Sequence, residues 1–293
     1  QGETDDATVG WLPEQRILTF TAHHVAVDGV SLTQLFTELL QLYKGDALGP
    51  PPPPVREHAA WELERIASPE GQAAERYWQG VLENAPQIRL PVDVPESEAR
   101  RFAGKELCVR VPAARLRARS RELGVSPYML LLSAFGGLLH RWSGQRELMI
   151  GIVHAGRDQR FEKTVGMFAN TLPLRLRIPA LFRELVADVK HKSLEVVAQD
   201  LPYEHIVQKL SGTRGPLFES MFSYERADGR SISIGEAQFA EVRLPRATSL
   251  FSFSLDVIDL GDELDLRFEY AHPRMALETA QRVRDEDRPG TTD

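Results

Sequence analysis

Two adjacent histidines followed by an aspartate are the clearest candidates for chemistry in this sequence. They lie in the run HHVAVDG at positions 23–29. Imidazole is the side chain whose ordinary pKa lies nearest neutrality, so His24 could transfer a proton or stabilise a charge that develops during a reaction. Asp28 could accept a hydrogen bond or pair with a buried cation.

A strand, a turn and a helix are expected to position these residues. Residues 16–22 alternate and are rich in β-formers, which predicts a strand that ends at His23 and His24. Because successive strand side chains point to opposite faces, only one of the two histidines would face a given cavity. Gly29 is expected where the chain turns sharply into a helix over 31–44, whose first turn has the capping-box spacing of Ser31 and Gln34.

Spacing alone leaves two other roles open for the histidines. Together with Asp28 they could bind a metal ion. Helical geometry between His24 and Asp28 conflicts, however, with the strand before and the glycine after, and no HExxH-like set of ligands accompanies them. The other alternative is a structural histidine that satisfies local hydrogen bonds.

The remaining pattern predicts a mixed α/β fold, since helices and strands follow one another without a strict βαβ rhythm. Five prolines at 50–54 predict a stiff spacer, and Gly261-Asp262 predicts a hairpin turn. Helices are expected over 57–66, 70–82, 113–123, 127–142, 180–199, 203–210 and 276–284, and strands over 105–111, 147–153, 171–178, 217–224, 231–242, 250–259 and 263–270.

Composition argues against several classes of protein. The net charge is −7, which disfavours a nucleic-acid partner, and no apolar run is long enough to predict a membrane span or a signal peptide. Cys108 is the only cysteine, so an intrachain disulfide is impossible, and its place in an alternating segment indicates an inert thiol. We expect a cytoplasmic protein, and the start at Gln1 suggests an internal piece of a longer polypeptide.

The motif at 23–29 resembles the HHxxxDG signature of condensation domains of nonribosomal peptide synthetases. Six further segments match that family in the expected order over nearly the whole chain. They are 57–61 (YxDFAxW, first positions altered), 75–78 with 90–93 (YW and LPxD), 150–157 (IGxxxxGR), 166–175 (GxxxNTxxxR), 199–204 (HQDLPFE) and 216–222 (PLFxxMF).

The resemblance implies two chloramphenicol-acetyltransferase-like lobes in a V, the first of them incomplete. Residues 1–60 would be the remaining part of the N-terminal lobe with the histidine motif and a proline linker, 61–284 the C-terminal lobe, and 285–293 a linker or tail. It also implies an acyltransferase that joins two carrier-tethered substrates through an amide bond in antibiotic-type secondary metabolism. The domain would bind no cofactor itself, because phosphopantetheine on donor and acceptor carrier domains tethers the substrates, and an adenylation domain would lie adjacent.

The resemblance also assigns site residues. His24 would be catalytic, with His23 packed beneath it and with Asp28 and Gly29 as its scaffold. The substrate channel would include Ser31, Arg157 and Asn170. The family pairs the motif aspartate with an arginine upstream of the histidines, and none precedes them here in a matching motif. We therefore expect Asp28 to lack its partner and the chain alone to be unstable or inactive.

Two alternatives stay beside amide formation. An epimerisation-type relative usually continues its motif with Trp-Arg, whereas this chain has Ser31-Leu32-Thr33. A non-catalytic relative that only recruits carriers tends to lose the motif, and His24 is intact. The arginines at 115, 117, 119 and 121 are either a solvated helix face or a docking patch for an acidic carrier.

Overall fold

The computed structural model describes residues 7–14, 16–91, 93, 102–210, 217–226, 231–234, 237–240, 242, 246–273 and 275. The chain divides into two compact units, the first formed by 1–73 with 154–170 and the second by 74–153 with 171–293. The expected boundary lay after residue 60. The first unit instead reaches residue 73 and also includes the segment 154–170.

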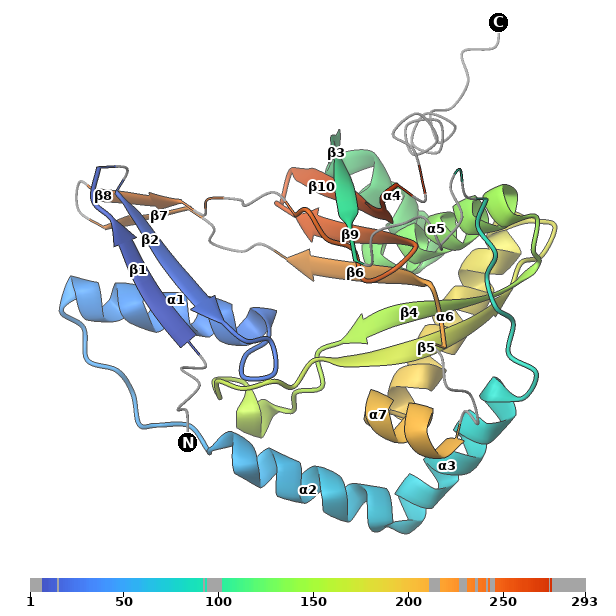
Figure 1. Ribbon diagram of the computed structural model, residues 1–293, viewed down its shortest axis with the longest axis horizontal. Helices are drawn as coiled ribbons and strands as arrows, with labels where there is room; N and C mark the ends of the chain where they lie inside the picture. The colour runs from blue at the N-terminus through green and yellow to red at the C-terminus, as the bar shows by residue number, and fades with distance from the viewer. Residues whose placement is uncertain are drawn as a thin grey trace, which may run out of the picture. The chain divides into compact units, whose positions relative to one another are not determined.

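The first unit contains an antiparallel hairpin and the helices that follow it (Figure 1). Strand β1 (Ala7–Leu12) pairs with β2 (Ile17–Ala22), with Ala7 opposite Ala22. Strand β2 matches the strand predicted over 16–22, whereas β1 was not foreseen. The helices are α1 (Gly29–Lys44), α2 (Val55–Ala67) and the start of α3 (Pro69–Leu82).

Helix α1 begins differently from the prediction. Its N-cap is Asp28, whose side chain accepts a hydrogen bond from the backbone N–H of Ser31, so Ser31 is the third helical residue rather than the cap. Gly29 is already helical, and the start of the helix therefore does not depend on a glycine turn. Gly45 ends the helix in the left-handed conformation (φ 86°), directly after the last residue of the predicted range.

The proline run lies inside the first unit instead of linking two lobes. Pro54 has the polyproline conformation (φ −70°, ψ 149°) and is the residue before α2. The Pro53 carbonyl accepts a hydrogen bond of 2.8 Å from the Thr164 hydroxyl, which ties the run to the segment 154–170. The stiff spacer thus helps to bring distant parts of the chain together.

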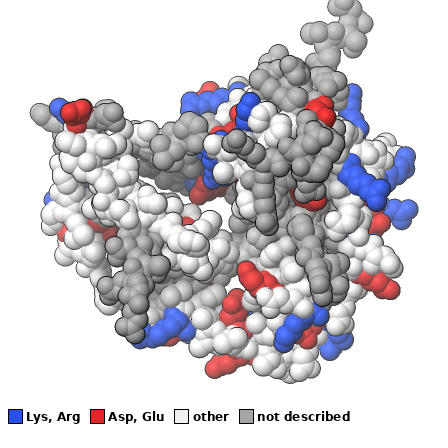
Figure 2. Space-filling view, viewed as in Figure 1, with Lys and Arg blue, Asp and Glu red and all other residues white. Residues whose placement is uncertain are grey.

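The hairpin and α1 expose apolar side chains to solvent. Trp11 is 56% exposed on β1 and Leu42 is 55% exposed on α1, and Val9, Leu18, Phe36 and Leu39 are also exposed. Figure 2 shows few charged side chains over these elements on the face in view. Apolar area of this kind usually marks a surface that packs against further protein.

The second unit is a mixed six-stranded sheet with helices packed on it (Figure 1), which confirms the predicted α/β class. The strand order is β3-β10-β9-β6-β4-β5, parallel from β9 through β6 to β4 and antiparallel from β3 through β10 to β9. The strands are β3 (Gly104–Pro112), β4 (Glu147–His154), β5 (Asn170–Arg177), β6 (Ser220–Arg226), β9 (Phe253–Asp259) and β10 (Glu263–Ala271). The helices are α4 (Ala113–Leu123), α5 (Pro127–Ser143) and α6 (Phe182–Ala198).

Helix α5 supplies the centre of this core. Phe135 stacks on Phe253 of β9 with ring centroids 6.0 Å apart, and Trp142 meets the same ring edge-on at 5.1 Å. Leu132 and Leu139 on the same helix have no exposed surface. Burial of such a continuous apolar face accounts for the agreement between the predicted and observed bounds of α5.

The elements predicted after residue 200 agree with the structure only in part. The strand predicted over 231–242 is a hairpin of β7 (Ser231–Ile234) and β8 (Ala237–Ala240). The helix predicted over 203–210 is one turn, α7 (Tyr203–His205), followed by a π turn over Ile206–Leu210. The hairpin at Gly261 is confirmed, with φ 92° at that residue. The helix predicted over 276–284 and the tail 285–293 lie outside the described residues.

Across the described ranges, no single helix is long and apolar enough to span a membrane, and the pair α4 and α5, which together reach that length and composition, is bent by 96°.

Candidate active site

His23 and His24 lie in a tight turn that follows β2. The backbone N–H of Ala26 donates to the His23 carbonyl over 2.9 Å and closes this turn. Strand β2 ends at Ala22, so the strand alternation expected for the two histidines does not apply. His23 and His24 are both exposed residues, and the packing of His23 beneath His24 stays a prediction.

The hydrogen bonds of the two rings give them opposite tautomers when neutral. His24 Nδ1 lies 3.0 Å from the Val27 carbonyl oxygen, which can only accept, so Nδ1 carries the proton and Nε2 keeps a lone pair. His23 Nδ1 instead accepts the Val25 N–H over 3.1 Å, which leaves the proton on Nε2. The Nε2 lone pair of His24, an exposed residue, can accept a proton from a bound reactant.

Asp28 holds this turn through a buried carboxylate with 2% of its surface exposed. Its two oxygens accept four hydrogen bonds, from the N–H groups of Ser31, Phe168 and Ala169 and from the Arg157 guanidinium. Burial raises the pKa of Asp28, but the hydrogen bonds, led by the one from Ser31, outweigh burial and lower it below its ordinary value. The carboxylate therefore stays ionised as the anchor of the turn.

The partner of Asp28 is Arg157, which corrects the expectation that Asp28 lacks one. Arg157 Nη2 lies 2.7 Å from Asp28 Oδ1, and the two side chains are 7% and 2% exposed. The other terminal nitrogen donates to the carbonyls of Phe161 (3.0 Å) and Thr164 (2.6 Å). Arg157 thus fastens the segment 154–170 to the histidine turn, and its place in the substrate channel stays a prediction. The lack of an upstream arginine is therefore no longer a reason to expect an unstable or inactive chain. Whether the chain is active by itself stays a prediction.

Ser31 also belongs to this scaffold, and its place in a substrate channel stays a prediction. Its hydroxyl is fully buried, donates to the Gly166 carbonyl (2.7 Å), and accepts from the Gly166 N–H (2.9 Å) and from Arg157 (2.7 Å). Asn170, the third predicted channel residue, is half-buried at the start of β5.

Gly156 allows the two ends of the segment 154–170 to lie in close contact, with residue 156 against the backbone of Phe168. It has a φ of 62°, and a Cβ placed there would lie 2.0 Å from the Phe168 carbonyl oxygen. A residue with a side chain would therefore be strained in its backbone and would also collide with a backbone atom. The glycine next to Arg157 is what allows the N–H groups of residues 168 and 169 to reach Asp28.

His58 is a site residue that the sequence analysis missed. Its ring is 7% exposed and packs against the rings of Trp61, Phe161 and Phe168, with centroids 5.5, 5.2 and 4.7 Å away. Burial lowers the pKa of His58, and the Arg157 and Arg65 guanidiniums lower it further against the opposite effects of Asp158 and Gly156. A histidine on the apolar face of a predicted helix was the available signal.

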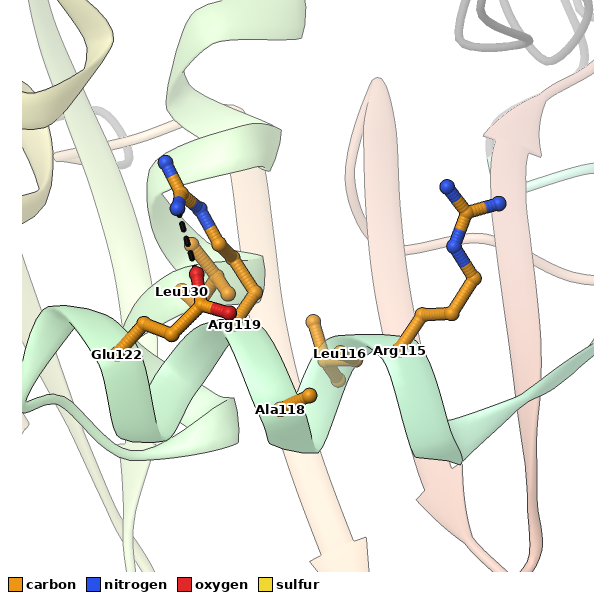
Figure 3. Close-up of a pocket in the computed structure, with 6 residues that line it drawn as sticks. All are labelled: Arg115, Leu116, Ala118, Arg119, Glu122 and Leu130. Carbon is orange, nitrogen blue, oxygen red and sulfur yellow. Dashed lines mark hydrogen bonds and ion pairs between the residues drawn. The ribbon is translucent and has the colours of Figure 1, made fainter.

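The arginine stretch on α4 divides into a structural and an exposed part. Arg117 pairs with the nearly buried Asp259 over 2.6 Å. Figure 3 shows Arg115 and Arg119 beside a hollow of about 570 Å³ that Leu116, Ala118, Glu122 and Leu130 also line. Arg119 bonds to Glu122 over 2.7 Å in an exposed pair.

Among the described residues, no group of three or more His, Cys, Asp or Glu side chains could hold a metal ion. Asp28 in particular turns its carboxylate toward Arg157 instead of toward the imidazoles. Cys108 lies exposed on β3, opposite Arg267 of β10.

The fold and the histidine turn together define a mixed α/β domain of the condensation type. A family model described as "Condensation domain" matches residues 7–286, and the chain belongs to this family. The family joins carrier-tethered substrates through an amide bond.

Named relatives agree with this assignment. Gramicidin S synthase 2 of Brevibacillus brevis is 32% identical over 288 residues, which cover 92% of this chain but only 6% of that much longer protein. The condensation domain of the Monacolin K polyketide synthase MokA superposes with a TM-score of 0.80 at 24% identity and covers 92% of this chain and 67% of its own. The epimerization domain from the third module of tyrocidine synthetase B reaches 0.74 at 18% identity, with 92% and 66% covered, so shape alone does not separate these activities.

Proposed function

We propose that this chain forms an amide bond between a donor acyl or peptidyl thioester and the amine of an aminoacyl acceptor, in nonribosomal peptide biosynthesis. The observation that carries the proposal is the ring of the exposed residue His24, whose Nδ1 proton is directed to the Val27 carbonyl and whose Nε2 keeps a lone pair. The buried contacts of Asp28 hold the backbone that presents this ring.

The reaction balances with one base. The acceptor nitrogen attacks the thioester carbonyl, the C–N bond forms, and the C–S bond breaks as the donor thiolate leaves. His24 Nε2 accepts the proton that the nitrogen loses and can return it to the departing sulfur. A neutral imidazole is required at the start, so Nε2 must be unprotonated when the acceptor binds.

The partners proposed for this domain are a donor and an acceptor carrier domain, each with a phosphopantetheine arm, and an adjacent adenylation domain. The domain itself binds no cofactor under this proposal, and the protein works in the cytoplasm. We place a carrier contact at the hollow on α4, because Arg115 and Arg119 present positive charge around an apolar floor that includes Leu116. An acidic carrier would complement that charge.

The decisive experiment uses the complete protein with both carriers loaded. His24→Ala should abolish amide formation while leaving carrier binding intact, and His191→Ala, on the exposed face of α6, should change neither. Full activity in His24→Ala would show that the mechanism is wrong. Inversion of the aminoacyl stereocentre without amide product would instead favour an epimerisation-type relative. Carrier binding with neither reaction in the unaltered protein would favour a recruiting role.

A further inference from the structure

His58 is a buried titratable group that the proposed reaction does not use. It lies on α2, in the same unit as the histidine turn, and is enclosed by the aromatic rings of Trp61, Phe161 and Phe168. A polar ring in such surroundings calls for an explanation, because burying it costs free energy that an apolar ring would avoid.

Two of the rings that touch His58 belong to residues that hold the Asp28–Arg157 ion pair. The backbone N–H of Phe168 donates to Asp28, and the Arg157 guanidinium lies over the Phe168 ring, 4.0 Å from its centroid. The Phe161 carbonyl accepts from Arg157 Nη1. A displacement of the His58 ring would therefore move the groups that fix Asp28, and with them the turn that carries His24.

We propose that His58 is a positioning residue whose neutral ring keeps the Asp28–Arg157 ion pair and the His24 turn in place, and whose protonation loosens both. The inference rests on the proposed role of His24. It makes the site dependent on two separate protons, one on the imidazole that reacts and one on an imidazole that only supports it.

Burial is the main effect that favours the neutral ring of His58, and the Arg157 and Arg65 guanidiniums act in the same direction. Arg65 on α2 lies over Trp61 with 5.3 Å to the centroid, Arg160 lies over Phe161 at 4.3 Å, and Arg157 covers Phe168. Asp158 and the Gly156 backbone act in the opposite direction, and the Asp28 carboxylate at the start of α1 is already paired with Arg157. A proton on His58 would thus place a positive charge on a ring that is only 7% exposed, near the Arg157 side chain, which is also 7% exposed.

The sign of the pH effect follows from the lowered pKa of His58. The ordinary pKa is 6.5, and the folded protein binds the proton less readily than the unfolded chain. Well above pH 6.5 the stabilisation that comes from neutral His58 is fully present. As the pH falls through 6.5, the unfolded chain takes up a proton at His58 before the folded protein does, and the stabilisation is lost. The first unit should therefore loosen in mildly acidic solution.

The test compares the complete protein with its His58→Phe variant, because phenylalanine keeps a flat aromatic ring but cannot titrate. Amide formation is measured in single turnovers with loaded carriers between about pH 5 and pH 8, the range over which imidazoles titrate. The proton on His58 should make the acid limb of the unaltered protein up to about tenfold steeper per pH unit than the limb of His58→Phe, which cannot take up that proton. His191→Gln, an exposed histidine on α6, is the matched control and should keep the steeper limb.

A second measurement needs no activity. Hydrogen–deuterium exchange of the backbone around Phe168 and Ala169, corrected for the intrinsic effect of pH, should accelerate in the unaltered protein between about pH 7.5 and 5.5 but not in His58→Phe. Acceleration without any amide formation would support the positioning role and refute the proposed function. The inference would be overturned if the unaltered protein and His58→Phe showed the same pH dependence of hydrogen–deuterium exchange and the same acid limb of amide formation. If His58→Phe does not fold, pH-independent exchange in the unaltered protein would overturn it alone.

Discussion

Asp28 and Arg157 form a buried ion pair of 2.7 Å although they are 129 residues apart in the chain. The guanidinium bonds to the carboxylate and to the Ser31 hydroxyl on one side and to two carbonyls of its own segment on the other. The histidine turn is therefore supported by a distant part of the same unit.

Arg157→Ala should destabilise the first unit by about 3–5 kcal/mol, because it leaves the Asp28 carboxylate buried without its cation. Urea unfolding followed by tryptophan fluorescence measures this loss. Arg119→Ala breaks an exposed pair with Glu122 and should cost less than about 1 kcal/mol. Equal losses of stability in Arg157→Ala and Arg119→Ala would show that the buried ion pair stabilises the protein no more than the exposed pair does. Arg157→Lys should recover only part of the stability, since an ammonium lacks the planar fork that meets four acceptors.

Gly156→Ala should destabilise the protein by more than about 2 kcal/mol, through both the positive φ and the clash with the Phe168 carbonyl. Gly144→Ala separates these causes. Gly144 has a φ of 72°, but no atom outside its own neighbours lies within 4 Å of the place that a Cβ would occupy. Gly144→Ala should therefore lower the free energy of unfolding by only about 1–2 kcal/mol. Thermal unfolding of both variants gives the comparison, and a smaller loss for Gly156→Ala would contradict the steric argument.

Acid should weaken the Asp28 anchor at a lower pH than it affects His58. The pKa of Asp28 is depressed below 3.8, so its stabilising effect is complete above that pH and is lost as the pH falls through the lower, folded value. The free energy of unfolding, measured in urea from about pH 2 to pH 7, should fall at this acid end. Asp28→Asn should be less stable at neutral pH and should show a shallower acid loss, whereas parallel curves would exclude Asp28 as the source.

Reversal of the charges beside the α4 hollow tests the carrier contact. Arg115→Glu with Arg119→Glu should weaken carrier binding at least about tenfold, with a smaller effect at high salt because the attraction is screened there (about 10 Å Debye length at 0.1 M). Arg121→Glu makes the same kind of charge change on the same helix without lining the hollow, and it should bind nearly normally. Unchanged affinity in the double variant would rule out this surface.

The sequence predicted the elements well wherever one strong local pattern decided the outcome. Helix α4 has the predicted bounds, since Gly124 stops it in the left-handed conformation (φ 63°). Prediction failed where two local signals competed. Ser31 and Gln34 have capping-box spacing, yet Asp28 caps α1 because its carboxylate is also fixed by Arg157.

The supporting parts of the site were harder to predict than the motif itself. His24 and Asp28 lie close together in the chain, and their spacing was enough to single them out. Arg157 was recognised only as part of a family segment, because no local pattern shows that it would fold back onto Asp28. His58 escaped notice for a similar reason: its significance comes from the rings of Phe161 and Phe168, which lie roughly 100 residues further along the chain.

The separation of Asp28 from Arg157 has a consequence for biosynthesis. At roughly 5–20 residues per second, a ribosome needs about 6–26 seconds to make the 129 residues from the aspartate to the arginine. During that interval the Asp28–Arg157 ion pair cannot form, so the histidine turn is made well before the residue that supports it. The order of synthesis therefore delays the fixed form of the histidine turn until the segment that contains Arg157 has been made.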